Sequence, residues 1–135
     1  AVTIPVIANG DICSVEDARK ALDQSGADGV MIGRGAYGRP WLLRQVMDAL
    51  EGRTPRSDPS IDEQYRLIVS HYDDMLSLYG NEVGVNMARK HLGWYTRGLH
   101  GSAEFRNRVN QVPDAEVVKA MLAEFYAPWT ARAAA

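Results

Sequence analysis

The 135-residue sequence has little of several features that mark particular classes of protein. A single cysteine, Cys13, excludes an internal disulfide and fits the reducing cytoplasm. No apolar run is long enough to cross a bilayer, and the histidines have no metal-ligand spacing with the cysteine. The net charge of -2 argues against a generally basic nucleic-acid binder. We therefore expect a cytoplasmic protein that has neither a membrane span nor a metal site.

Two short apolar runs lie near the start of the chain, at residues 4–8 and 29–32. Neither run alternates with polar residues, which is typical of strands buried on both faces of a parallel sheet that helices cover. The stretch between the runs has the pattern of one amphipathic helix, with Ser14 and Gly26 as its caps. Pro40 is placed to start a second helix after the second run. The order of these elements predicts an α/β fold for this part of the chain.

Each apolar run is followed by a loop that contains glycine, at residues 9–11 and 33–35. Glycine lets backbone N–H groups turn outward, and a helix start adds unpaired N–H groups and partial positive charge. In (β/α)8 barrels, a phosphate site of this kind is commonly built after the last two strands. The alternative is that these residues only stabilise tight turns. Two such loops in tandem favour phosphate binding.

A polar linker at residues 52–60 contains two prolines. The chain after this linker is predicted to be helical. Ser60 and Glu63 have the spacing of a capping box, and Ser102 and Asp114 are candidate caps of later helices. The sequence predicts four helices, at residues 61–79, 82–97, 102–110 and 114–127. The end of the chain, residues 128–135, is expected to be disordered. The whole chain is thus expected to be α/β followed by all-α.

Charge is unevenly distributed along the chain. Residues 89–108 hold five basic residues and one acidic residue, whereas residues 51–82 hold three basic and seven acidic residues. A local basic patch can bind phosphate even when the whole chain is slightly acidic. The segment 89–108 is therefore the candidate nucleic-acid surface.

The basic residues at 89–91 spread around the expected helix because neighbours in sequence do not share a face. Arg89 and Arg97 lie roughly on one face, and Lys90 shares a neighbouring face with Trp94. Arginine and lysine beside aromatic rings suit contacts with an RNA backbone and stacking on bases. The alternative is a solvated helix face with Trp94 in the core.

Three sequence motifs resemble one enzyme family. PVIANGDI at 5–12 and GVMIGRGAYGRPWL at 29–42 resemble the end of the barrel of tRNA-dihydrouridine synthases, flavin enzymes that reduce uridine in tRNA. ARKHLGWYTRG at 88–98 is similar to the C-terminal helical domain of the same family, most of all its bacterial B-type branch. The barrel motif is shared with other FMN barrels, but its combination with the helical motif is specific. The resemblance extends to about Tyr126.

This resemblance implies a fold and a division of labour. Residues 1–51 would form the last two βα units of an FMN-binding TIM (β/α)8 barrel, and residues 61–127 a helical tRNA-binding domain. It implies that the FMN phosphate and ribityl chain are contacted by Asn9, Gly10, Asp11, Gly33 and Arg34. It implies that tRNA is bound by Arg89, Lys90, His91 and Arg97, with Arg106 and Arg108 extending the patch.

The resemblance also implies the reaction of an intact enzyme. NADPH reduces FMN, the reduced flavin passes hydride to C6 of a uridine in tRNA, and a cysteine protonates C5. That cysteine belongs to an earlier barrel loop that this chain lacks, so we expect Cys13 to be structural and no residue here to be catalytic. Because two βα units cannot close a barrel, we expect the chain to be the C-terminal part of a longer protein. By itself it should be inactive and bind FMN weakly or not at all.

Three alternatives differ from this interpretation. The first is another FMN barrel oxidoreductase that acts on a small molecule, in which the basic helices have no ligand. The second is an RNA-binding helical module without catalysis. The third is a purely structural helical domain, which predicts no salt-dependent binding of RNA.

Overall fold

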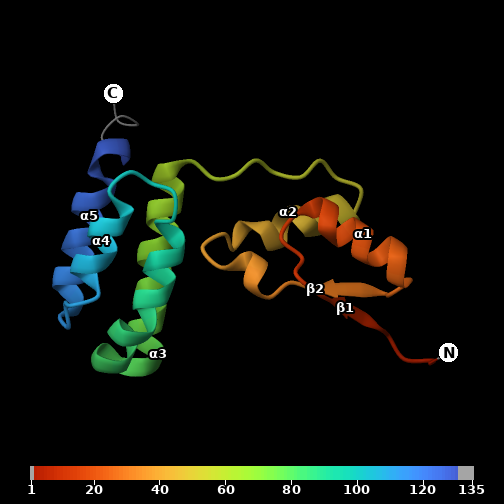
Figure 1. Cartoon of the computed structure of the whole chain (residues 1–135), viewed down its shortest axis with the longest axis horizontal. Helices are drawn as coiled ribbons and strands as arrows, with labels where there is room; N and C mark the ends of the chain where they lie inside the picture. Colours follow the sequence, from red (N-terminus) through yellow and green to blue (C-terminus); the bar gives the residue numbers. More distant parts are fainter. Residues whose placement is uncertain (1, 131–135) are drawn as a thin grey trace. The chain divides into compact units, whose positions relative to one another are not determined.

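The computed structural model describes residues 2–130 of the chain. The chain divides into two compact units, Ala1–Asp58 and Pro59–Ala135. We call them the α/β unit and the helical unit and describe each by itself (Figure 1). The described residues are mostly helical and include one small parallel sheet.

The α/β unit consists of two short strands and the helices that follow them. Its elements are, in order, β1 (Ile7–Asn9), α1 (Val15–Ser25), β2 (Gly29–Met31), the 3₁₀ helix η1 (Arg34–Ala36) and α2 (Trp41–Leu50). The strands pair in parallel, with Ile7 opposite Gly29 and Asn9 opposite Met31. The carboxyl ends of both strands therefore lie at the same edge of the sheet.

Helix α1 begins and ends where the sequence predicts. The Ser14 hydroxyl accepts a hydrogen bond from the Asp17 amide at 3.0 Å, which satisfies one of the free N–H groups of the first turn. Gly26 adopts a left-handed conformation with φ of 65°, and its amide donates to the Leu22 carbonyl. Both predicted caps are confirmed.

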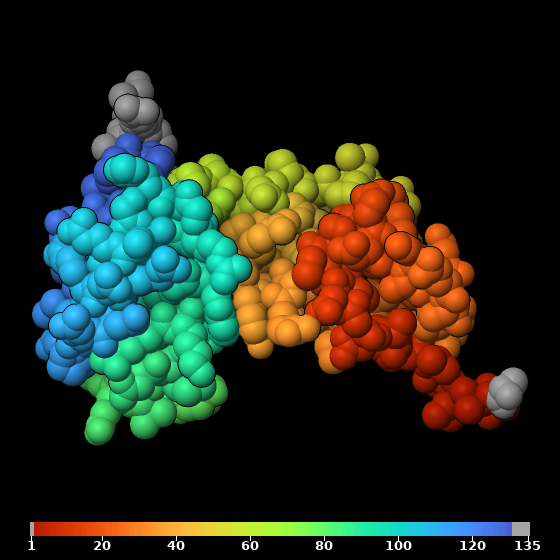
Figure 2. Space-filling model, viewed as in Figure 1, coloured from red at the N-terminus to blue at the C-terminus, as the bar shows by residue number. Residues whose placement is uncertain are grey.

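The strands are shorter than the apolar runs, and in the described residues only one face of the sheet is covered. Helices α1 and α2 cover one side of the sheet (Figure 1), where Ile12, Ala18, Leu42 and Val46 form the core. The side chains that point the other way stay exposed, at 57% for Ile7 and 48% for Met31. The physical reason is that two strands and two helices form only two layers. Residues just before β1 project from the body of the unit (Figure 2).

The helical unit is built from α3 (Ile61–Tyr95), α4 (Ser102–Val109) and α5 (Ala115–Thr130). Helix α3 is interrupted at Gly80, whose φ of 75° and ψ of 167° are not helical. The segments before and after Gly80 pack closely, because a Cβ at Gly84 would lie 2.9 Å from the Met75 carbonyl oxygen. The predicted break at Gly80 is confirmed, although the two segments form one assigned element rather than two.

The core of the helical unit lies between α3 and α5. Its fully buried side chains include Ile68, Tyr72, Leu92, Leu122 and Tyr126. The Tyr72 hydroxyl donates a long hydrogen bond of 3.5 Å to the Ala115 carbonyl and so links the two helices. Burial of these side chains supplies the stability that short helices lack by themselves.

The caps of the last two helices were predicted with different success. Asp114 accepts hydrogen bonds from the Glu116 and Val117 amides at 2.9 Å each, as predicted for the start of α5. Ser102 does not cap α4, because the cap position is Gly101 in a left-handed conformation with φ of 76°.

Of the expected disordered end at residues 128–135, residues 128–130 belong to α5 and residues 131–135 lie outside the described residues. No helix in the described part of the chain has both the length and the apolar character of a membrane span.

The capping box at the start of α3 gives a direct test of helix stability. Ser60 accepts from the Glu63 amide at 3.3 Å, and the Glu63 carboxylate accepts from the Ser60 amide at 2.8 Å. Substitution Ser60→Ala removes the hydroxyl, so the free energy of unfolding should fall by about 1 kcal/mol in urea titrations. The control Ser57→Ala, at an exposed linker residue, should change it by less than about 0.5 kcal/mol. Equal values for the two variants would contradict the capping role.

Candidate functional site

The loops that follow β1 and β2 meet at one edge of the sheet, because the strands are parallel and paired in register up to Asn9 and Met31. Together they line a hollow of about 290 Å³. Its lining residues are Asn9, Gly10, Asp11, Ile12, Gly33, Arg34 and Gly35. The structure therefore brings together all five residues that the sequence predicts for cofactor binding.

Gly35 sets the distance between the two loops, and the sequence analysis did not include it among the site residues. A Cβ at this position would lie 2.1 Å from the Ile12 carbonyl oxygen and 3.0 Å from the Cys13 Cα. A side chain of any size would therefore push the loops apart. The Gly33-x-Gly35 spacing is visible in the sequence, but the contact with Ile12 joins segments that lie 23 residues apart.

Arg34 and Asp11 form an ion pair across the mouth of the hollow. The Arg34 Nη2 atom donates to Asp11 Oδ1 at 2.5 Å, and both side chains are more than three-quarters exposed. Asp11 adopts a positive φ of 42°, a conformation that aspartate tolerates better than most residues. The Asp11 carboxylate thus contacts the arginine of the other loop. An exposed pair of this kind contributes at most about 1 kcal/mol, so an anion can compete for the guanidinium.

The backbone of the second loop supplies further donors. The amides of Arg34 and Gly35 lie in the first turn of η1, where no acceptor exists within the helix. Ala36 and Tyr37 already donate to the carbonyls of Gly33 and Arg34. The hollow thus combines glycine backbone, first-turn amides and one arginine, which is the donor set of an anion site.

The four residues predicted to bind RNA do not share one exposed surface. Lys90 and Arg97 are exposed, whereas Arg89 and His91 are half-buried. Arg89 Nη2 donates to the Val112 carbonyl at 3.4 Å, and its Nε atom is buried with no hydrogen-bond partner among the described residues. Arg89 thus directs its guanidinium toward the Val112 carbonyl, whereas the Arg97 side chain is exposed.

His91 belongs to a cluster of rings within the helical unit. Its ring centroid lies 4.9 Å from that of His71 and 5.0 Å from that of Trp94. His71 Nδ1 is within hydrogen-bond distance of the Tyr95 hydroxyl, at 3.0 Å. Burial lowers the pKa of His91, and the charge of His71 lowers it further. The His91 ring is therefore harder to protonate than an ordinary histidine and is held within the ring cluster.

Two arginines of α4 were considered as extensions of the basic patch. The side chain of Arg106 lies against Gly93 of α3, since a Cβ at Gly93 would be 3.4 Å from Arg106 Cδ. Arg108 instead approaches Glu124 of α5 at 3.8 Å. Arg106 is therefore the α4 arginine that lies beside the α3 residues.

No group of three or more potential metal ligands occurs among the described residues.

Substitution Gly35→Ala tests the close approach of the two loops. The added Cβ must displace the Ile12 backbone, which should lower the stability of the α/β unit by about 1–3 kcal/mol. Hydrogen exchange of peptides from α1 and α2 measures this locally. Gly10→Ala in the first loop is the matched control, because no atom lies within 4 Å of its added Cβ. Equal exchange in both variants would show that the loops are not held together by Gly35.

The position of His91 predicts a pH dependence of the helical unit. Because the pKa of His91 is lowered on folding, the unfolded chain takes up a proton at a higher pH than the folded chain does. The free energy of unfolding should therefore decrease as the pH falls below about 6.5, the ordinary pKa of histidine. Urea titrations at pH 8 and pH 5.5 measure the difference. The difference in unfolding free energy between the two pH values should shrink in His91→Gln. It should persist in the control His100→Gln, which changes an exposed histidine. A difference that is the same in all three proteins would contradict this role of His91.

Comparison with known proteins places these features in a family. Residues 1–128 match the family described as dihydrouridine synthase (Dus). Over 125 residues the chain is 54% identical to a probable tRNA-dihydrouridine synthase of Rickettsia conorii. The aligned region covers 93% of this chain and 38% of that protein. It is 42% identical over 126 residues to tRNA-dihydrouridine synthase B of Pseudomonas putida, with 93% and 37% covered.

A third relative, the probable tRNA-dihydrouridine synthase of Rhodobacter capsulatus, is 45% identical over 122 residues, with 90% of this chain and 37% of that protein covered. The chain thus spans less than two-fifths of the length of these curated relatives. The paired glycine loops and the basic helix that lies beyond the linker both fall within the matched residues. The family match over nearly the whole chain shows that this chain belongs to the dihydrouridine synthase family.

Proposed function

We propose that this chain is part of a tRNA-dihydrouridine synthase that reduces the C5–C6 bond of uridine in tRNA with NADPH-reduced FMN. The α/β unit supplies part of the site for the FMN phosphate, and the helical unit holds the tRNA. The observation that carries the proposal is the common hollow formed by the two glycine loops, together with the family match. The B-type name of the Pseudomonas relatives supports the same branch of the family.

The residues of the hollow fit the phosphate end of FMN. A phosphate needs several N–H donors and a positive charge, which the amides of Arg34 and Gly35 and the Arg34 guanidinium can supply. Asn9 and Asp11 offer side-chain oxygens to the hydroxyls of the ribityl chain. Sites for whole cofactors measure about 300–1,000 Å³ and are mostly apolar. The lining of the hollow is mostly polar, with Ile12 as its large apolar residue, so we assign it to the phosphate end of FMN.

When bound, FMN supplies the hydride chemistry, whereas the described residues supply binding. Cys13 is exposed and does not line the hollow. In this proposal the general acid belongs to another part of the enzyme. The role of this chain in catalysis is thus to hold the phosphate and the tRNA.

The tRNA surface of the helical unit is proposed to be Lys90, Arg97 and Arg106, which we call the basic face. Lys90 is exposed one turn before Gly93, against which Arg106 lies, and Arg97 follows the end of α3. Lysine and arginine side chains at such positions contact phosphates without reading base sequence. Arg89 is left out because its guanidinium is directed to the Val112 carbonyl.

The basic face can be tested by the salt dependence of tRNA binding in the full-length protein. Lys90→Gln and Arg97→Gln should each weaken binding and reduce the slope of log K against log salt concentration by about 1 per lost phosphate contact. Fluorescence anisotropy with labelled tRNA at several salt concentrations measures both quantities. Dihydrouridine content, followed by mass spectrometry of digested tRNA with NADPH and FMN present, reports the activity itself.

The matched control is Arg66→Gln, an equal change of charge at an exposed arginine near the start of α3. It should leave the slope unchanged. A slope that is the same in all variants would remove the basic face from the proposal. Absence of dihydrouridine formation by the unmodified full-length protein would overturn the proposed activity.

A further inference from the structure

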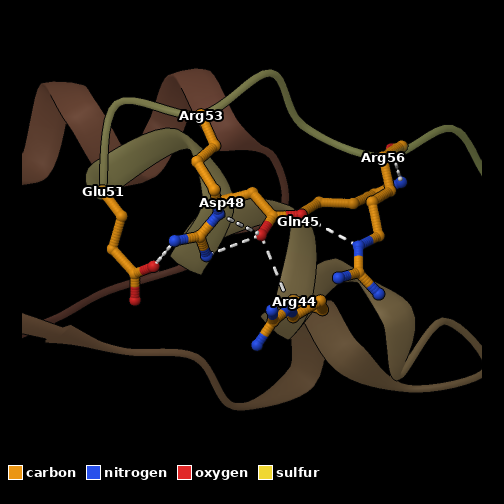
Figure 3. Close-up of polar contacts among 6 residues, drawn as sticks. All are labelled: Arg44, Gln45, Asp48, Glu51, Arg53 and Arg56. Carbon is orange, nitrogen blue, oxygen red and sulfur yellow. Dashed lines mark hydrogen bonds and ion pairs between the residues drawn. The ribbon is translucent and has the colours of Figure 1, made fainter.

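Asp48 of α2 is a buried carboxylate that three arginines surround. Its side chain is only 3% exposed. Arg53 Nη2 lies 2.7 Å and Arg44 Nε 3.4 Å from Oδ1, while Arg56 Nε lies 3.3 Å from Oδ2 (Figure 3). The hydrogen bonds from Arg53, and then the charges of all three arginines, hold the pKa of Asp48 below its usual range despite burial. A buried carboxylate without such partners would be strongly unfavourable.

Two of these arginines come from the segment that was predicted to be an exposed linker. We call residues 53–58 of this segment the strap. Arg53 and Arg56 attach the strap to Asp48. Glu51, at the end of α2, also pairs with Arg53 at the surface (Figure 3). The strap is thus exposed to solvent, yet ionic contacts fix it along α2.

The far end of the strap is attached as well. Asp58 Oδ1 accepts hydrogen bonds from Trp41 Nε1 at 3.0 Å and from Gln45 Nε2 at 2.9 Å. Gln45 Nε2 also donates to the Arg56 carbonyl at 2.9 Å. Gln45 is only 8% exposed, so without the strap its amide would lose both of its hydrogen-bond partners.

Trp41, Gln45 and Asp48 lie at positions i, i+4 and i+7 of α2 and therefore share one face of the helix. The strap contacts this polar face from both of its ends, and Asp48 Oδ2 is reached by the ion pair with Arg56 rather than by a hydrogen bond. The contacts explain why the α/β unit extends through Asp58 rather than ending with α2. Only Pro59 and Ser60 then remain between the strap and the first residue of α3.

We propose that Asp48 is a positioning residue that clamps the strap to α2 and thereby shortens the free tether of the helical unit from residues 52–60 to residues 59–60. A flexible tether of nine residues has a root-mean-square length of about 17 Å, whereas two residues give about 8 Å. A shorter tether keeps the helical unit at a higher effective concentration near the α/β unit. The consequence for tRNA rests on the proposed function, but the clamp itself does not.

Limited trypsin digestion of the full-length protein tests the clamp, because the strap contains two cleavage sites, Arg53 and Arg56. Asp48→Asn keeps the shape of the side chain but removes the charge that attracts the arginines. Cleavage after Arg53 and Arg56, followed by mass spectrometry, should become about tenfold faster or more. Glu51→Gln is the matched control, since Glu51 contacts only Arg53 at the surface, and its rate should stay within about twofold of the unmodified protein.

A second variant keeps the test decisive if Asp48→Asn weakens the whole α/β unit. Arg56→Ala changes a side chain that is 66% exposed and leaves Arg44 and Arg53 on Asp48, so it should lower the melting temperature by less than Asp48→Asn does. Cleavage after Arg53 should nevertheless accelerate, because one attachment of the strap is lost. If cleavage after Arg53 is unchanged in Arg56→Ala, or cleavage at both sites is unchanged in Asp48→Asn, the clamp is overturned.

A positioning role also predicts effects that loss of stability alone would not cause. Fluorescence energy transfer between a dye on each unit should show a broader range of distances in Asp48→Asn at a temperature where both units remain folded. An unchanged distribution would overturn the tether argument. In the activity assay the same variant should raise the KM for tRNA by more than it lowers kcat. If KM rises by no larger a factor than kcat falls, the consequence for tRNA is rejected. The clamp itself would then still be judged by the trypsin digestion.

Discussion

Parallel pairing of β1 with β2 is the constraint on which the candidate site depends. It is made by only three residues from each strand, yet it fixes two loops from distant parts of the sequence at one edge. Gly35 then allows the loops to approach to backbone contact, which a larger residue would prevent. The proposed anion site therefore depends on the chain's topology, because the paired strands place Arg34 and the first-turn amides at one edge of the sheet.

The helical unit depends on a different constraint, the reversal at Gly80. The reversal lays the two segments of α3 against each other and brings His71 beside His91 and Tyr95. The inner side of this hairpin is a packed cluster of rings, while its outer side carries Lys90. The same helix thus contributes both to the core and to the proposed tRNA surface, and side chains next to each other in sequence have different roles.

Local signals in the sequence predicted the helices well. The helix caps at Ser14, Gly26, Ser60 and Asp114 could be predicted from the sequence, because each cap depends on residues within four positions of it. Contacts between distant segments were not readable. The burial of Asp48, the docking of the strap and the inward direction of Arg89 arise from tertiary packing, and polar composition alone made the strap resemble a free linker. The spacing of the glycines and the resemblance pointed to the two glycine loops, whereas the close approach of Gly35 to Ile12 required coordinates.

The uncovered face of the sheet has a consequence for how this chain behaves in solution. Ile7 and Met31 present apolar side chains on a sheet of two strands, and such a sheet is only marginally stable in water. Each strand also has an outer edge with unpaired backbone groups that another strand can extend. Self-association through added strands is thus the natural competitor to correct folding, and it would be favoured by high concentration rather than by low ionic strength.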